Sequence, residues 1–247
     1  MKKPKQFPTW YDPTYSGRHN SNLSQSISRL ETAKTYKDLS TVMVLPTRGV
    51  IPAKVCNALW SLMTPMNGKF FRHIVEGKEV GQAYNEAVET ILANSELSKW
   101  KYMLTVEEDN LPPPDGLLKL YENMDKYDAI GGLYFTKGDC GMPMIYGDVR
   151  EMPKNFRPQI PIPNAIQECN GLGMGFTLFK ISMLKKMTEK GIWPLFKTVQ
   201  EFKYGEGASL GTQDLYFFGL AGREGYRFAS DNRVLVGHLD QENGIVW

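Results

Sequence analysis

The chain has 247 residues, of which 42% are hydrophobic and 23% are charged, as in a globular protein with one large domain or two small ones. Its formal charge of +2 neither requires nor excludes a nucleic-acid partner. Three widely separated cysteines argue against a disulfide framework or a zinc site and favour a cytoplasmic location, and no apolar segment is long enough to predict a membrane span.

Residues 1–38 are rich in Pro, Ser, Asn and Tyr and have no periodicity, which predicts an extended leader. Lys2, Lys3 and Lys5 make its start basic. A solvated tail is favoured over a nucleic-acid arm, because a few lysines are common in such tails.

Strands and helices alternate in the next hundred residues. Short apolar runs predict strands at residues 42–45, 70–75, 102–106 and 129–135. Apolar residues at helical spacing predict helices at 51–62, 80–91 and 117–124. The alternation predicts an α/β fold with a mostly parallel sheet flanked by helices. Ligands bind beyond the carboxyl ends of such strands, where loops 46–49, 76–78 and 107–110 would meet.

The second half is less regular. Residues 136–168 contain many Gly and Pro residues and predict a mobile loop over the site. The segments that follow predict strands at 175–181, 226–229 and 234–237, and helices at 182–190 and 213–223.

Three acids, Glu107, Glu108 and Asp109, follow the third predicted strand. If the strand geometry continues, Glu107 and Asp109 point to one side and Glu108 to the other. Two carboxylates on one side can hold Mg²⁺ or Mn²⁺, which leaves positions for substrate phosphates. The alternative is a solvated acidic loop, which the triplet alone favours.

The residues around the triplet change this balance. Residues 102–115, which read Tyr-Met-Leu-Thr-Val-Glu-Glu-Asp-Asn-Leu-Pro-Pro-Pro-Asp, resemble the Asp-x-Asp region of family 2 glycosyltransferases with the GT-A fold. The resemblance extends from Thr41 to His238. It implies a Rossmann-like GT-A sheet and a metal-dependent transferase that uses a nucleoside-diphosphate sugar, most often a UDP-sugar. Asp109 matches the second metal-binding acid, and Glu107 stands where the family has its first Asp.

The resemblance also implies a nucleotide-binding side on the first two strands and the helix after them. The residues that it assigns there are Pro46, Thr47, Arg48, Glu76, Gly81, Asn85 and Glu108. Tyr84 stands where many relatives have Arg, so a basic contact of the family is absent from the sequence.

On the acceptor side, the resemblance assigns Asn170, Gly171 and Gly173, whose segment would let the backbone approach a sugar or acceptor closely. A flexible hinge is an equally good interpretation of these glycines. Asp214 matches the general base of inverting members, although Gln213 replaces the usual preceding Glu; the alternative role for Asp214 is charge compensation at a helix N-terminus. His238 matches the histidine that completes the metal site.

We therefore predict a leader at residues 1–38 and a single GT-A domain at 39–247, with a nucleotide-binding half (39–135) and an acceptor-binding half (136–247). The predicted metal ligands for Mn²⁺ or Mg²⁺ are Glu107, Asp109 and His238. Two alternatives remain: a viral enzyme that glycosylates modified bases in DNA, and a non-catalytic nucleotide-binding protein with a degenerate site.

Overall fold

The computed structural model describes residues 38–65, 68–203 and 207–247, with the side chains of 201–210 left aside. The predicted leader, apart from Asp38, lies outside the described residues.

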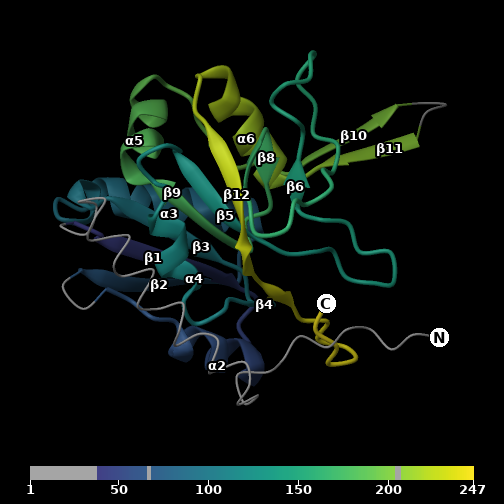
Figure 1. Cartoon of the computed structure of the whole chain (residues 1–247). Coiled ribbons are helices and arrows are strands. Elements are labelled where there is room, and N and C mark those ends of the chain that lie inside the picture. The colour runs from purple at the N-terminus through teal and green to yellow at the C-terminus, as the bar shows by residue number, and fades with distance from the viewer. Residues whose placement is uncertain (1–37, 66–67, 204–206) are drawn as a thin grey trace.

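A seven-stranded sheet in the order β2-β1-β3-β9-β5-β12-β7 forms the centre of the molecule (Figure 1). Its strands are β1 (Thr41–Thr47), β2 (Phe70–Glu76), β3 (Tyr102–Val106), β5 (Ala129–Leu133), β7 (Ile166–Cys169), β9 (Phe176–Lys180) and β12 (Phe228–Leu235). Strand β1 is parallel to β2 and β3, and β12 is parallel to β5. Strand β9 is antiparallel to its neighbours β3 and β5, and β7 is antiparallel to β12. The predicted α/β fold with a mostly parallel sheet is confirmed.

Helices cover both faces of this sheet (Figure 1). They are α2 (Ala53–Ser61), α3 (Val80–Ala93), α4 (Gly116–Tyr121), α5 (Ile181–Glu189) and α6 (Gln213–Arg223), with a 3-10 turn, η2, at Leu97–Lys99. Apolar residues of α3, α5 and α6 form one core cluster with the sheet, and those of α2 and α4 form the other. The predicted helix positions follow from this packing, because each apolar stripe faces the sheet.

Two predictions for the second half were wrong. Residues 226–229 and 234–237 are not two strands; β12 runs through Asp231 and Asn232, whose polar side chains are buried. Asp231 pairs with Arg233 on the same strand, and the Asn232 amide donates to the distant Ile162 carbonyl at 2.9 Å, so both buried polar groups have partners.

The segment predicted as a loop, 136–168, also contains strands. It contributes β7 and β6 (Ile145–Tyr146), and β6 pairs with β8 (Gly171–Leu172). A further hairpin, β10 (Val199–Lys203) with β11 (Gly207–Gly211), projects from the body (Figure 1). These strands were missed because they are short and their pairing partners are distant in sequence.

A short strand pair joins the segment around His238 to the acidic segment. Strand β4 (Asn110–Leu111) is antiparallel to β13 (Gly237–His238), and His238 stands opposite Asn110. This pairing places His238 beside the acids that follow β3. Among the described helices, none has the length and apolar composition needed to cross a membrane.

Candidate functional site

The candidate site lies at the carboxyl ends of β1 and β3. A cavity of about 370 Å³ opens there. The residues that line it are Pro46, Thr47, Arg48, Lys78, Glu79, Val80, Glu107, Glu108 and Asp109. The cavity thus joins the first predicted loop to the acidic segment, as expected for ligand binding beyond parallel strands.

The acidic segment is a turn and not the continued strand on which the predicted side-chain alternation depended. Strand β3 ends at Val106, and the Asn110 amide donates to the Glu107 carbonyl at 3.1 Å. The Leu239 amide donates to the Asp109 carbonyl at 2.7 Å and ties this turn to the C-terminal segment. The position of the three carboxyl groups is therefore set by the turn and by β13.

Asp109 lies between two nitrogen groups. Its Oδ2 is 2.6 Å from Lys137 Nζ and 3.4 Å from His238 Nε2. Burial by itself would raise the pKa of Asp109, but the hydrogen bonds and charges of His238 and Lys137 outweigh it and lower the pKa to about 2. Asp109 is therefore a carboxylate at any pH near neutrality.

The geometry around His238 suits a divalent cation. Its Nδ1 lies 2.7 Å from the Phe135 carbonyl, a contact that requires a proton on Nδ1, and Nε2 is the ring nitrogen that faces Asp109. A backbone carbonyl that orients the second ring nitrogen in this way is typical of metal-ligating histidines. A carboxylate oxygen and a ring nitrogen that face each other can share a proton or hold a cation, so Asp109 and His238 fit as two protein ligands.

The third predicted metal ligand is Glu107. The described residues contain no group of three or more His, Cys, Asp or Glu side chains arranged to hold one metal ion. Manganese and magnesium sites commonly use one or two protein carboxylates and complete their coordination with phosphates and water. The three-residue ligand set remains a prediction, whereas the pair Asp109 and His238 has the required donor chemistry.

Glu107 faces the cavity but is largely removed from water. It accepts a hydrogen bond from the Tyr84 hydroxyl at 3.4 Å. Burial first, and then the charges of Asp109 and Asp214, raise the pKa of Glu107 to about 8. The structure thus brings three predicted acids together with Tyr84.

The raised pKa of Glu107 predicts a pH-dependent stability. The folded state binds the Glu107 proton more tightly than the unfolded chain, so the free energy of unfolding falls as pH rises from about 4.5 to about 8. Glu107→Gln cannot ionise and should exceed the wild type in stability at about pH 8 by on the order of 3 kcal/mol, with little difference near pH 4.5. Urea unfolding of chelator-treated protein at both pH values tests this, with exposed Glu89→Gln as the control. Equal pH dependence of wild type and Glu107→Gln would contradict it.

Glu108 holds the loop after β1. It accepts hydrogen bonds from the Thr47 hydroxyl at 2.8 Å and from the Arg48 amide at 2.9 Å, and it pairs with the Arg48 guanidinium at 2.5 Å. These contacts outweigh burial, which acts in the opposite direction, and lower the pKa of Glu108. Pro46, Thr47 and Arg48 are thereby fixed at the cavity, and the Arg48 side chain remains 78% exposed and available to a ligand.

Three other predicted nucleotide-side residues lie nearby with different contacts. Glu76 is exposed at the end of β2 beside Gly49, and it is not one of the described residues that line the cavity. Gly81 is buried where α3 approaches Phe196 and Gln213 too closely for a larger side chain to fit without adjustment. The Asn85 amide binds main-chain groups of Leu195 and Phe196 and braces that segment.

Asp214 is buried in the first turn of α6, 5% exposed. Its Oδ1 accepts from the Thr212 hydroxyl and from the Leu215 amide, the latter at 2.8 Å. Burial raises the pKa of Asp214 despite these hydrogen bonds. The contacts are those of a carboxylate at a helix N-terminus, and its charge also acts on Glu107, Tyr84 and Tyr134.

The glycine segment on the acceptor side is closely packed. Buried Asn170 donates to the Asn155 carbonyl at 3.0 Å, and Gly171 lies against the Phe156 ring. The space beside Gly173 is taken by the Tyr134 hydroxyl, which accepts from the Gly175 amide at 2.9 Å. The space beside these glycines is filled by side chains of the protein itself, and this close packing argues against a hinge.

Gly173→Ala should therefore destabilise the fold. Its Cβ would clash with the Tyr134 hydroxyl, and overpacking of this kind costs roughly 1–3 kcal/mol. Gly219→Ala is the matched control, because a Cβ there would meet only the Phe156 ring at 3.8 Å. That control should be neutral or up to about 1 kcal/mol more stable, since Ala favours the helix. Urea denaturation of both variants measures the difference; an unchanged Gly173→Ala protein would refute the packing argument.

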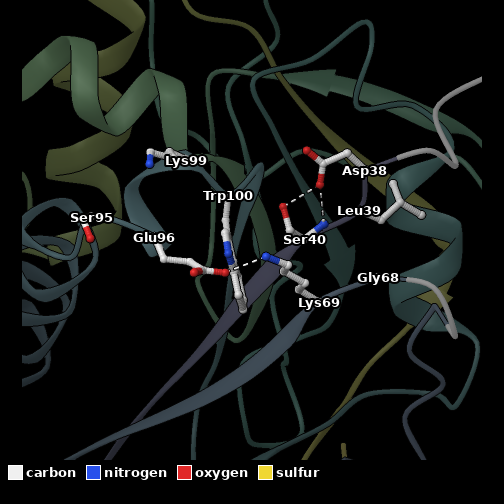
Figure 2. Close-up of a pocket in the computed structure, with 9 residues that line it drawn as sticks. All are labelled: Asp38, Leu39, Ser40, Gly68, Lys69, Ser95, Glu96, Lys99 and Trp100. Carbon is white, nitrogen blue, oxygen red and sulfur yellow. Dashed lines mark hydrogen bonds and ion pairs between the residues drawn. The ribbon is translucent and has the colours of Figure 1, made fainter.

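A larger cavity, of about 520 Å³, lies at the opposite end of the sheet (Figure 2). Ser40 and Lys69, which directly precede β1 and β2, contribute to it, as does Trp100, two residues before β3. The Lys69–Glu96 ion pair, at 2.5 Å, is drawn as a dashed line in Figure 2. This cavity faces the amino ends of the parallel strands, away from the acids, so its size does not make it the candidate site.

Two side chains of the site were missed by the sequence analysis. Lys137 lies in the turn after β5, in a stretch rich in Gly and Pro, and no local pattern indicates that it reaches Asp109. Tyr134 packs edge-on against the His238 ring, with 5.5 Å between centroids, and it reads in sequence as an ordinary strand residue. Only the approach of β5 to β13 reveals either role.

Comparisons with known proteins identify the fold. No family description and no curated protein matches the sequence. Among solved structures, A197 from STIV aligns with a TM-score of 0.56 and 20% identity, over 82% of this chain and 87% of that chain. TarS from S. aureus, in complex with UDP-GlcNAc, aligns with a TM-score of 0.43 and 12% identity, over 77% of this chain and 55% of that chain. The likeness to A197 shows a common GT-A-like fold.

Proposed function

We propose that this protein is a glycosyltransferase that takes a sugar from a nucleoside-diphosphate sugar, with a UDP-sugar as the first donor to test. One observation carries the proposal: in a GT-A-like sheet, Asp109 and His238 converge at the edge of a cavity beyond the carboxyl ends of β1 and β3. That edge is where such sheets bind their ligands.

The cavity offers partners for a nucleotide. Pro46, Thr47 and Val80 line the cavity, and Arg48 and Lys78 contribute positive charge to its lining. Arg48 is held by Glu108 through its Nε, which fixes its direction while most of the side chain stays in water. Cations so placed suit the phosphates of the donor.

We assign a divalent metal, Mn²⁺ or Mg²⁺, to Asp109 and His238. When bound, it would neutralise negative charge on the departing diphosphate. Asp109 is ionised, as a metal-binding carboxylate must be, and Nε2 of His238 faces it as the second donor atom. Glu107 adjoins them and is retained as a candidate third ligand.

Asp214 is the proposed general base. It is a buried carboxylate in the same cluster, and its raised pKa makes it a better proton acceptor than an exposed aspartate. Its backbone contacts fix the side chain, so that an acceptor hydroxyl would meet a base in one orientation.

A ligand screen by thermal shift tests the proposal. UDP, GDP and the corresponding sugar nucleotides are added with and without Mn²⁺, and a bound ligand raises the melting temperature by mass action. We expect one nucleoside diphosphate to stabilise the protein, more strongly with Mn²⁺, and Mn²⁺-dependent release of that diphosphate from its sugar. Binding without turnover in any metal would favour the non-catalytic alternative, and no binding would reject both.

A further inference from the structure

Lys137 is positioned by the backbone around it. It lies in a turn after β5, in which the Thr136 amide donates to the Met142 carbonyl at 2.8 Å and the Met142 amide donates to the Thr136 hydroxyl at 2.8 Å. Phe135 and Pro143 form a bridge just outside this turn. The stem of Lys137 is therefore held close to the site, while its long side chain keeps rotational freedom.

The ammonium group occupies the cation position of the site. Lys137 Nζ lies 2.6 Å from Asp109 Oδ2, the same oxygen that faces His238 Nε2 at 3.4 Å. An ammonium and a divalent ion at one carboxylate oxygen would repel each other strongly at such short range. A metal bound by Asp109 and His238 thus requires Lys137 to leave Asp109.

A released Lys137 would be an unpaired cation next to the cavity. Its side chain is 34% exposed, so it can turn without unpacking the core. Lysine binds phosphate as a point charge. The diphosphate of a donor bound with the metal would supply the partner that Asp109 no longer provides.

We propose that Lys137 is the resident counter-ion of Asp109 in the ligand-free protein and couples the binding of metal to the binding of the donor diphosphate. Metal alone binds weakly because it must displace Lys137. Metal and diphosphate together bind cooperatively because the displaced ammonium gains a phosphate partner, and the coupling is reciprocal. This inference rests on the proposed function and adds to it a residue that the family resemblance does not supply.

Titration of the protein with Mn²⁺ alone, with free Mn²⁺ measured by electron paramagnetic resonance, tests the displacement. Lys137→Met should bind Mn²⁺ about tenfold more tightly than the wild type, because no ammonium competes for Asp109. Lys137→Arg should stay close to the wild type. Lys185→Met is the matched control: Lys185 is exposed on α5 and is not among the described residues that line the cavity, so its loss should leave the Mn²⁺ affinity unchanged.

A second titration adds UDP at a fixed concentration. Wild-type protein should gain Mn²⁺ affinity when UDP is present, and Lys137→Met should lose most of that gain.

Equal or weaker Mn²⁺ binding by Lys137→Met in the absence of UDP overturns the inference, as does the absence of Mn²⁺ binding to either protein. Nucleotide binding that persists without any Mn²⁺ effect would leave the donor proposal standing while this inference fails. Tighter Mn²⁺ binding by Lys137→Met without any nucleotide binding would leave the counter-ion role of Lys137 standing and would reject both the coupling and the donor proposal.

Discussion

Asp109→Asn is expected to lower metal-dependent release of the nucleoside diphosphate by about a thousandfold or more, because a metal's charge stabilisation of a leaving group is worth several kcal/mol. Asparagine keeps the shape of Asp109 but loses the charge that faces both His238 and Lys137. The measurement is diphosphate release from the sugar nucleotide across a range of Mn²⁺ concentrations.

The control for this variant is Asp139→Asn, which removes an exposed carboxylate two residues from Lys137 and should retain wild-type activity. Circular dichroism and urea unfolding establish that Asp109→Asn is folded. A folded Asp109→Asn protein with full Mn²⁺-dependent activity would eliminate the metal assignment.

The second large effect is expected at the proposed base. Asp214→Asn should slow the chemical step by about 10²–10⁴-fold, the usual contribution of a positioned general base. Asparagine can still accept the Leu215 amide hydrogen bond through its side-chain oxygen, so the start of α6 should persist. The thermal shift produced by UDP with Mn²⁺ should also persist, because Asp214 is not among the described residues that line the nucleotide cavity.

The pH profile separates this role from a structural one. A base must be ionised to act, and burial raises the pKa of Asp214, so the wild-type rate should fall on the acid side at a higher pH than for an ordinary aspartate. A carboxylate that only stabilises the helix would cost about 0.3–1 kcal/mol of stability on replacement and leave the rate unchanged. Single-turnover rates across pH for both proteins decide between these roles.

The regular part of the fold was accessible from local sequence. The run from Tyr102 to Val106 and the helix from Gln213 to Arg223 were predicted at the bounds that the structure gives. Both are long or strongly apolar, so local periodicity reports their burial directly. Strand β12 was divided in the prediction because Asp231 and Asn232 are polar. Asp231 pairs with Arg233 on the same strand, and Asn232 binds the distant residue Gln167.

The site was accessible only in part. Resemblance drew attention to Asp109, Asp214 and His238, and the structure places all three near one edge of the sheet. The position of Lys137 beside Asp109 could not be predicted, because a lysine in a Gly- and Pro-rich stretch is typical of a solvent-exposed loop. Asn85 was assigned to the nucleotide, yet its amide binds the main chain at residues 195–196, a contact that spacing cannot reveal.

The sequence by itself determined the layered α/β architecture and the position of three acids directly after β3, because strand and helix periodicity and a run of acids are local properties. The tertiary structure alone decided which acids lie close enough to shift one another's pKa and which cation faces Asp109. Those outcomes depend on β4 pairing with β13 and on the turn after β5 approaching both. Burial and Coulomb interactions vary with distances between residues far apart in the chain, and local sequence does not encode these distances.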